Sequence, residues 1–137
     1  MNSLLEMNNI KSTPFRVLLL KILSASKLPL SAAQILEELR TESLKAKVRF
    51  DRATLFRNLK SLEEAGVLIS SDFGRGASYY RLNSSQHHQH HIFCVSCERV
   101  EALDACVISP MVEKAQRRGF TVLGHHLELT GLCPKCA

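Results

Sequence analysis

The 137-residue sequence lacks any long uncharged apolar run, although 45% of its residues are hydrophobic. A helix that crosses a bilayer needs about 20 consecutive apolar residues, so we expect no transmembrane helix. The N-terminus lacks the basic and apolar regions of a signal peptide, which predicts a cytoplasmic location. Internal repeats are absent, and so is low-complexity sequence outside one histidine-rich run. A chain of this length has room for one buried core or two small ones.

The chain contains five cysteines. In a reducing compartment this number favours metal binding over disulfides. Cys94 with Cys97 and Cys133 with Cys136 form two Cys-x-x-Cys pairs. One such pair also fits a redox motif, but two at opposite ends of one segment are typical of a closed tetrahedral zinc site. We therefore predict one structural Zn²⁺, and we expect the remaining Cys106 to be a small buried apolar residue.

All six histidines lie outside the four-cysteine set, and four of them form the run His87-His88-Gln89-His90-His91. Clustered histidines also occur in solvated tails. This run, however, leads directly into the apolar segment Ile92-Phe93-Cys94-Val95, which is typical of a strand. The pattern predicts a second metal site at the beginning of that strand, and His125-His126 provides two further imidazoles.

The net charge of +5 is unevenly distributed. Residues 1–84 contain 13 Lys and Arg against 8 Asp and Glu, whereas residues 85–137 contain 5 of each kind. A basic half joined to a neutral metal-binding half predicts a protein that binds a polyanion and whose binding is regulated by a metal. A polar stretch places the boundary between a domain at residues 1–83 and a second at residues 84–137.

The first domain is predicted to begin with two helices. One starts at Pro14 with Thr13 as its N-cap and ends near Ala25. A capping box at Ser31 opens the next, which we expect to end within residues 40–43. The most basic part of the sequence follows these two helices.

A third helix in this basic part is predicted to run from its N-cap Asp51 to about Ala65, with a leucine stripe facing inward. Strands at residues 67–69 and 78–82 then form a β-hairpin, and three helices followed by a hairpin form a winged helix. A solvated basic face is the alternative, but the concentration of cations on one helix and one hairpin tip favours DNA binding. The residues expected to face the duplex are Arg52, Thr54, Arg57, Lys60 and Arg75.

The second domain is predicted to be a β-β-α-β-β module. Its helix has Ser109 as N-cap and Pro110 as first residue, and it ends before Gly119. Free edges of such a sheet recruit a strand from a second copy, so a homodimer is expected. The overall expectation is an α+β chain: a winged-helix DNA-binding domain followed by a small α/β dimerisation domain with a four-cysteine zinc site. The four strands are expected at residues 92–95, 99–103, 120–123 and 127–130.

The sequence resembles the ferric uptake regulator (Fur) family over nearly its whole length. The resemblance implies a dimeric, metal-activated repressor that binds a pseudo-palindromic operator in double-stranded DNA. It also implies that Phe56, at a position usually held by tyrosine, touches bases beside Arg57, and that Lys11 and Arg16 belong to the interface. The matching segments are Lys11 with Thr13 and Arg16, Arg52-Ala53-Thr54-Leu55-Phe56-Arg57, Glu64-Ala65-Gly66, the histidine run into Cys94-x-x-Cys97, and His125-His126-Leu127-Glu128-Leu129-x-Gly131-x-Cys133-x-x-Cys136.

The resemblance also identifies regulatory ligands. A hinge site common in the family falls here on Pro29, Arg81, Gln89 and His91, of which only His91 is a usual ligand. The family's second regulatory site falls on His88, His90 and His125. Its usual acidic ligand corresponds to Glu101, with Asp104 as the alternative.

Three imidazoles and one carboxylate favour Zn²⁺ over Fe²⁺ or Mn²⁺, since the latter ions prefer more oxygen ligands. We therefore expect a zinc-responsive (Zur-like) repressor of metal-uptake genes, with an iron-responsive or peroxide-responsive member as the alternative. A zinc-storage or chaperone protein would leave the basic helix unexplained. An enzyme is not expected, since the motif of zinc deaminases is absent and four cysteines leave no open coordination position.

Overall fold

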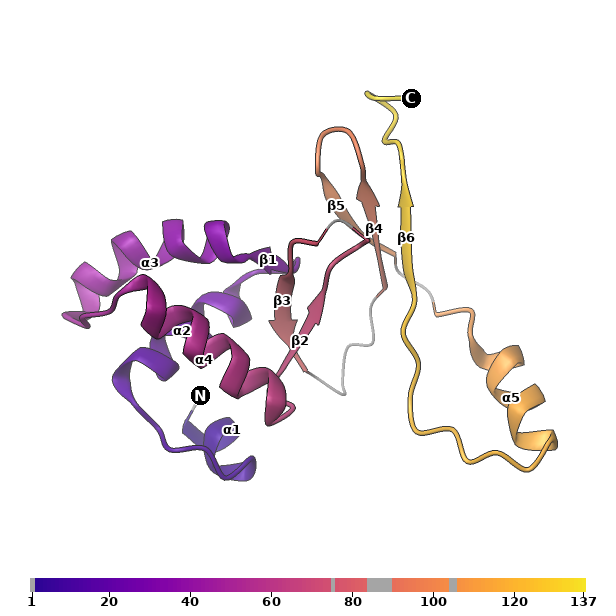
Figure 1. Cartoon of the computed structure of the whole chain (residues 1–137), viewed down its shortest axis with the longest axis horizontal. Helices are drawn as coiled ribbons and strands as arrows, with labels where there is room; N and C mark the ends of the chain where they lie inside the picture. The colour runs from indigo at the N-terminus through magenta and orange to yellow at the C-terminus, as the bar shows by residue number, and fades with distance from the viewer. Residues whose placement is uncertain (1, 75, 84–89, 104–105) are drawn as a thin grey trace. The chain divides into compact units, whose positions relative to one another are not determined.

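The computed structural model describes residues 2–74, 76–83, 90–103 and 106–137. His88, Arg75 and Asp104 lie outside the described residues. The chain divides into two compact units, Met1–Asn83 and Ser84–Ala137, and each contains a three-stranded sheet (Figure 1). The described residues include four helices in the first unit and one in the second. The predicted α+β class is thus confirmed. Within the described residues, no helix combines the length and the hydropathy that a membrane crossing requires.

The first unit has four helices around a small sheet. In this sheet β3 lies between β1 and β2, and both pairings are antiparallel. Three helices followed by the β2–β3 hairpin form the winged helix that the sequence predicts. The elements are α1 (Asn2–Met7), α2 (Pro14–Ala25), β1 (Leu30–Ser31), α3 (Ala32–Ala46), α4 (Arg52–Glu64), β2 (Leu68–Ser71) and β3 (Tyr79–Leu82).

All three predicted N-caps of this unit are present. The Thr13 hydroxyl accepts a hydrogen bond from the Arg16 amide at 3.2 Å, and the Asp51 carboxylate accepts one from the Thr54 amide at 2.7 Å. Ser31 forms its capping box with Gln34. These bonds satisfy amides that the first helical turn leaves without a backbone partner, and they therefore fix where each helix begins.

The end of α3 and the presence of α1 differ from the prediction. Helix α3 continues to Ala46, beyond the expected end. Ser43 is still buried in its last turns, and Lys47 then adopts a left-handed conformation with φ of 53° that ends the helix. Helix α1 was not predicted. Its Leu5 is fully buried in the core, so tertiary packing stabilises a helix too short to form alone.

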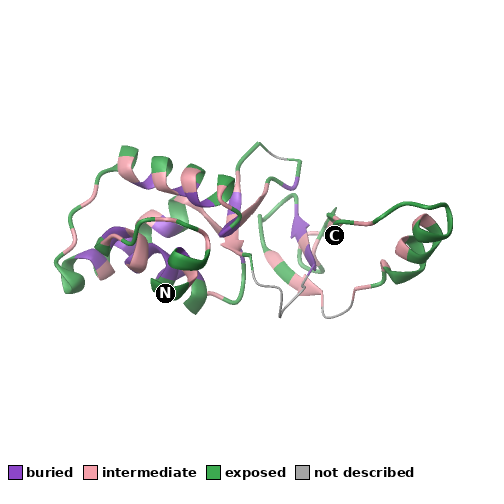
Figure 2. Cartoon of the chain, turned by 90° about the horizontal axis from the view of Figure 1, so that it is seen from below, coloured by how far each residue is buried: buried purple, intermediate pink, exposed green. Residues whose placement is uncertain are grey.

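Among the described residues, the hydrophobic core cluster lies in the first unit. Helix α4 contributes the predicted leucine stripe, with Leu55 and Leu62 fully buried and Leu59 1% exposed. Figure 2 shows the buried residues concentrated along the inner faces of these helices. The opposite face of α4 is thereby held toward solvent, which is the orientation that a DNA-reading helix requires.

The second unit contains β4 (His90–Cys94), β5 (Val100–Leu103), α5 (Ser109–Arg117) and β6 (Glu128–Gly131). Strand β4 is central: it pairs antiparallel with β5 and parallel with β6. No residue of α5 is buried in this chain, and Figure 2 shows the helix without any buried position.

Two predictions for this unit are wrong. Residues 120–123 form no strand, and Phe120 and Leu123 are 68% and 96% exposed. Their β-branched and aromatic character favours a strand only where a neighbouring surface covers them, and the described part of the chain provides none. Ser109 is the first residue of α5 instead of its N-cap; Ile108 takes that position, without a side-chain capping bond.

Candidate metal sites and nucleic-acid interface

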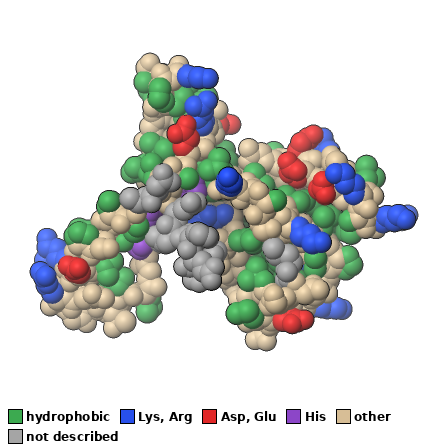
Figure 3. Space-filling model, turned by 180° about the vertical axis from the view of Figure 1, so that it is seen from behind, with side chains coloured by type: hydrophobic (Ala, Val, Ile, Leu, Met, Phe, Trp, Pro, Cys, Tyr) green, Lys and Arg blue, Asp and Glu red, His purple; other side chains and the backbone are tan. Residues whose placement is uncertain are grey.

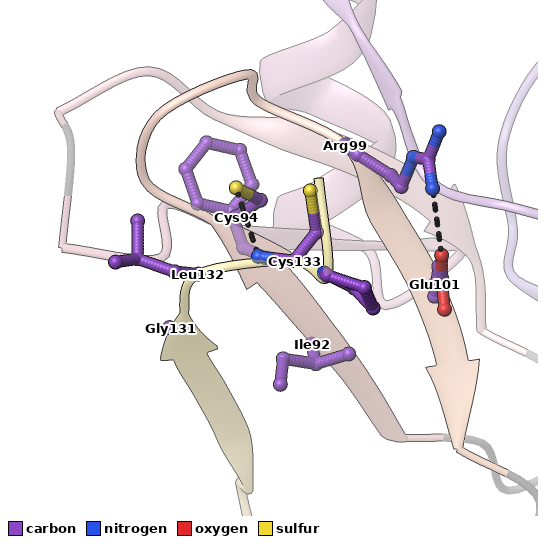
Figure 4. Close-up of a pocket in the computed structure, with 9 residues that line it drawn as sticks. Ile92, Cys94, Arg99, Glu101, Gly131, Leu132 and Cys133 are labelled. Atoms are coloured by element: carbon purple, nitrogen blue, oxygen red, sulfur yellow. Dashed lines mark hydrogen bonds and ion pairs between the residues drawn. The ribbon is translucent and has the colours of Figure 1, made fainter. Parts of the chain in front are cut away.

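The parallel pairing of β4 with β6 brings the two cysteine pairs together. Cys94 lies opposite Gly131 in the register, and a turn follows each strand at the same end of the sheet. The first turn is closed by a hydrogen bond from the Glu98 amide to the Cys94 carbonyl, and the second by one from the Cys136 amide to the Cys133 carbonyl, both at 2.9 Å. Each turn presents two sulfurs to the same volume. Figure 4 shows the Cys94 and Cys133 side chains next to each other at these strand ends.

The four sulfurs fit a zinc ion. They lie within 4.8 Å of one another, and Cys97 Sγ is 3.7 Å from Cys133 Sγ. Zinc–sulfur bonds of about 2.3 Å in a tetrahedron place two sulfurs about 3.8 Å apart. Hydrogen bonds from the backbone amides of Cys97 and Cys133 lower the pKa of Cys94 to about 6, which favours the thiolate that a metal binds.

A small apolar cavity of about 120 Å³ lies beside this site, lined by Ile92, Phe93 and Pro134 among others (Figure 4). Glu101, the predicted acidic ligand of the second site, lies at this cavity. Its carboxylate accepts a hydrogen bond from Arg99 at 3.4 Å. The structure therefore does not bring Glu101 into the imidazole group described next.

The second group of possible ligands lies at the other end of β4 and contains His90, His125 and Cys106. His90 Nε2 is 3.3 Å from His125 Nε2, and Cys106 Sγ is 3.3 Å from His90 Nε2 and 3.6 Å from His125 Nε2. His90 is buried, and its Nδ1 lies 3.2 Å from the Leu127 carbonyl oxygen. A carbonyl can only accept, so Nδ1 carries the proton and Nε2 presents a lone pair to the group.

Sequence reasoning placed His90 and His125 together and missed Cys106. The expectation of a small buried apolar side chain is not met, because Cys106 is only partly buried and its sulfur contacts two imidazoles. Its position between the two histidine segments, close to the expected acidic ligand, was the signal that could have identified it.

His91 and His126 are not members of this group. Successive residues of a strand point to opposite faces, so His91 points away from the face of His90. It is buried and pairs in register with Glu128. The Glu128 carboxylate lies 2.9 Å from His126 Nε2, and 64% of the His126 side chain is exposed.

The predicted DNA-reading residues lie on the outer face of α4. Arg52, Arg57 and Lys60 are exposed, and Thr54 is half-buried. Phe56 is 41% exposed, and the Arg52 guanidinium lies over its ring at 5.5 Å from the centroid. This cation–π contact leaves an aromatic side chain and a cation side by side at the surface.

The two predicted residues near α2 differ from each other. Arg16 Nε donates to the Asn58 side chain at 2.8 Å, and Arg16 Nη1 donates to the Lys11 carbonyl at 2.9 Å. Arg16 therefore fixes α2 and the preceding segment against α4, whereas the Lys11 side chain is exposed. On the face of the first unit seen in Figure 3, basic side chains project singly and acidic ones lie among them, so that face does not form a continuous cationic surface.

Comparison with known proteins identifies the family. Residues 7–130 match the family described as "Ferric uptake regulator family". The "Ferric uptake regulation protein" of Bordetella parapertussis is 33% identical over 129 residues, which cover 93% of this chain and 89% of that protein. The protein of the same name from Legionella pneumophila is 32% identical over 114 residues, or 75% of this chain and 83% of the relative.

Similar solved structures support the same family. The ferric uptake regulator of Pseudomonas aeruginosa with manganese has a TM-score of 0.78 at 28% identity, with 97% of each chain covered. The Vibrio cholerae ferric uptake regulator has a TM-score of 0.75 at 28% identity, with 96% of this chain and 98% of that chain covered. The chain therefore belongs to the Ferric uptake regulator family, whose members are metal-responsive transcriptional regulators and not enzymes.

Proposed function

We propose that this chain is a zinc-responsive repressor of metal-uptake genes that binds a pseudo-palindromic operator in the cytoplasm. The observation that carries the proposal is the convergence of His90 Nε2 and His125 Nε2 at 3.3 Å, with His90 held in the tautomer that presents Nε2. Neutral imidazoles suit Zn²⁺ better than the oxygen-preferring divalent ions. His88, which the sequence analysis adds to this set, would supply another imidazole.

The regulatory site would act by joining distant parts of the second unit. His90 is the first residue of β4, and His125 lies in the extended segment before β6. Ligands from both segments are held together when a metal is bound, which lowers the conformational freedom of the unit. Metal binding then raises the affinity for DNA if the conformation that the metal stabilises is the one that fits the operator.

We assign dimerisation to the second unit. Helix α5 and the segment after it carry an unusual amount of exposed apolar surface for one chain, since Val107, Met111 and Phe120 are 63–74% exposed and Leu123 is 96% exposed. Exposed apolar patches mark interaction sites, and a second copy would cover this one. Two copies related by a twofold axis bind two half-sites, which is why the operator is expected to be a pseudo-palindrome.

The test of the function is the affinity for an operator-like duplex, measured by fluorescence anisotropy at fixed ionic strength with zinc, iron(II), manganese(II) or no added metal. The protein carries one equivalent of Zn²⁺ in the four-cysteine site throughout. We expect zinc to tighten binding by about 5- to 150-fold, the range typical of allosteric coupling. Equal affinity with and without every metal would contradict regulation by metal.

An iron-responsive regulator is the second candidate, because the curated relatives described above carry the name "Ferric uptake regulation protein". The same titration separates the two. If iron(II) tightens DNA binding at a concentration at which zinc has no effect, iron(II) is the regulatory metal and the chain is still a metal-responsive repressor.

Replacement of Arg57 is expected to weaken DNA binding. Arg57 is exposed on the outer face of α4, and a lost bidentate contact to a base typically reduces the binding free energy by about 1–3 kcal/mol. We expect Arg57→Ala to lower the affinity for the duplex by about 5- to 150-fold in the presence of zinc. Arg40→Ala is the matched control, because Arg40 is an exposed arginine on α3 paired with Glu37 at 3.2 Å. Equal losses in the two variants would mean that α4 does not read the duplex.

A further inference from the structure

We infer that Cys106 supplies a thiolate ligand to the regulatory metal site, which makes this site selective for ions that bind sulfur. The inference rests on the regulatory role proposed above for His90 and His125. It changes the chemistry of that site, because the sequence predicts a carboxylate ligand in addition to imidazoles and the inference replaces it by a thiolate. A site with two nitrogens and one sulfur suits Zn²⁺ and softer ions, whereas a carboxylate would shift the preference toward Fe²⁺ and Mn²⁺.

The distances between the three donor atoms fit one tetrahedral ion. With zinc–nitrogen bonds of about 2.0–2.1 Å and a zinc–sulfur bond of about 2.3 Å, two nitrogens lie about 3.3 Å apart and a nitrogen and a sulfur about 3.5 Å apart. The observed separations are 3.3 Å between the two nitrogens, and 3.3 Å and 3.6 Å from the sulfur to them. The three atoms therefore form one face of a zinc-sized tetrahedron.

Hydrogen bonds within the triangle do not explain these contacts as well. The His90 Nδ1 proton is directed at the Leu127 carbonyl, so a neutral His90 has no proton on Nε2. The Cys106 thiol and a neutral His125 then provide at most two protons for three close contacts among acceptor atoms. A cation shared by all three atoms satisfies every contact at once.

Cys106 is also free of competing metal chemistry among the described residues. The other four cysteines lie together in the zinc site at the opposite end of β4, and all five are free of disulfides. Glu101 pairs with Arg99 and is not among the donor atoms grouped with the two imidazoles. Cys106 is thus the residue that completes the described donor set, and a fourth position is left for another side chain or water.

The first experiment uses cobalt(II) as a spectroscopic probe. The protein is loaded with one equivalent of Zn²⁺, which occupies the four-cysteine site, and Co²⁺ is then titrated into the second site. One thiolate ligand predicts a near-ultraviolet sulfur-to-cobalt charge-transfer band of roughly a quarter of the intensity of a four-cysteine cobalt site. We expect Cys106→Ser to lose this band. Identical spectra of the two proteins would overturn the inference.

A second experiment needs no variant. Iodoacetamide is reacted with protein that holds one or two equivalents of Zn²⁺, and the alkylated cysteines are identified by mass spectrometry. The first equivalent protects the four-cysteine site and leaves Cys106 as the reactive thiol. We expect the second equivalent to protect Cys106 as well. Alkylation of Cys106 at the same rate in both samples would contradict coordination by its sulfur, whatever the fold of Cys106→Ser.

These outcomes are separable from those of the proposed function. If zinc does not change DNA affinity in the unmodified protein, the regulatory role fails, yet the cobalt band and the protection of Cys106 still report a thiolate site. If zinc does change DNA affinity but Cys106 stays reactive and the cobalt band is absent, the thiolate assignment fails and the repressor stands. Cys106→Glu adds a third readout, since a carboxylate at this position is expected to lower the ratio of zinc to manganese affinity.

Discussion

Loss of the four-cysteine site is expected to unfold the second unit. In the variant Cys133→Ser with Cys136→Ser, we expect hydrogen exchange at the β4 amides to rise to the rate of an unfolded chain, while the first unit keeps its protection. The amides to monitor are those of Cys94, which donates to the Arg99 carbonyl at 2.8 Å, and Val95, which donates to the Gly131 carbonyl at 2.9 Å. The apparent folding free energy of a structural zinc site is about 10–16 kcal/mol in small domains, so the effect is large.

The reason is the distribution of buried apolar surface. Every residue of the hydrophobic core cluster belongs to the first unit. In the described part of the second unit, the buried residues are two histidines of β4 with Phe93 and Cys94. A unit of this size with so few buried apolar side chains needs another source of stability, and the metal site provides one in addition to the proposed dimer contact.

The control for this prediction is Cys106→Ser, which removes a thiol of the same unit without touching the four-cysteine site. It is expected to keep the amide protection of β4 in protein loaded with one equivalent of zinc. If the Cys133 and Cys136 double variant, or protein treated with a strong chelator, retains that protection, the second unit is folded by packing and the site has no structural role.

Replacement of His125 is expected to abolish the response to metal. In His125→Ala we expect DNA affinity measured in zinc to fall to the value measured without it, a loss of the whole 5- to 150-fold coupling. His125 Nε2 is one of the two imidazole nitrogens that converge, and its removal disconnects the segment before β6 from the beginning of β4. Affinity without added metal should be the same as in the unmodified protein.

His126→Ala provides a closely matched control. His126 is the next residue, its side chain is largely exposed, and its imidazole pairs with Glu128 instead of joining the group. This variant should retain the zinc response. A full response in His125→Ala, or an equal loss in His126→Ala, would show that regulation does not pass through the site described here.

Local signals made much of the first unit predictable. Asp51 and Ser31 fixed where two helices begin, because their side chains bond to amides only three residues away. The leucine stripe of α4 follows from helical periodicity in the same direct way. By contrast, α1 depends on Leu5 packing into a core built from distant residues, and no local pattern reports such packing.

The candidate metal sites were predictable to different degrees. Two Cys-x-x-Cys pairs predict a common site from spacing alone, and their sulfurs are indeed adjacent. The composition of the second group depends on which residue after β5 lies next to His90 and His125. Spacing cannot distinguish Glu101 from Cys106 there, because the outcome depends on the tertiary position of each side chain: Glu101 pairs with Arg99, and Cys106 contacts both imidazoles.

The two groups of ligands lie at opposite ends of a single short strand. His90 and Cys94 are four residues apart on β4, or about 13 Å along an extended chain. Four cysteine ligands leave no open coordination position at one end, whereas the described donors at the other end leave a position for a further side chain or water. Under the proposed function, we expect the ion at the His90 end of the strand to exchange with free ion in solution, while the ion at the four-cysteine end is retained as part of the fold.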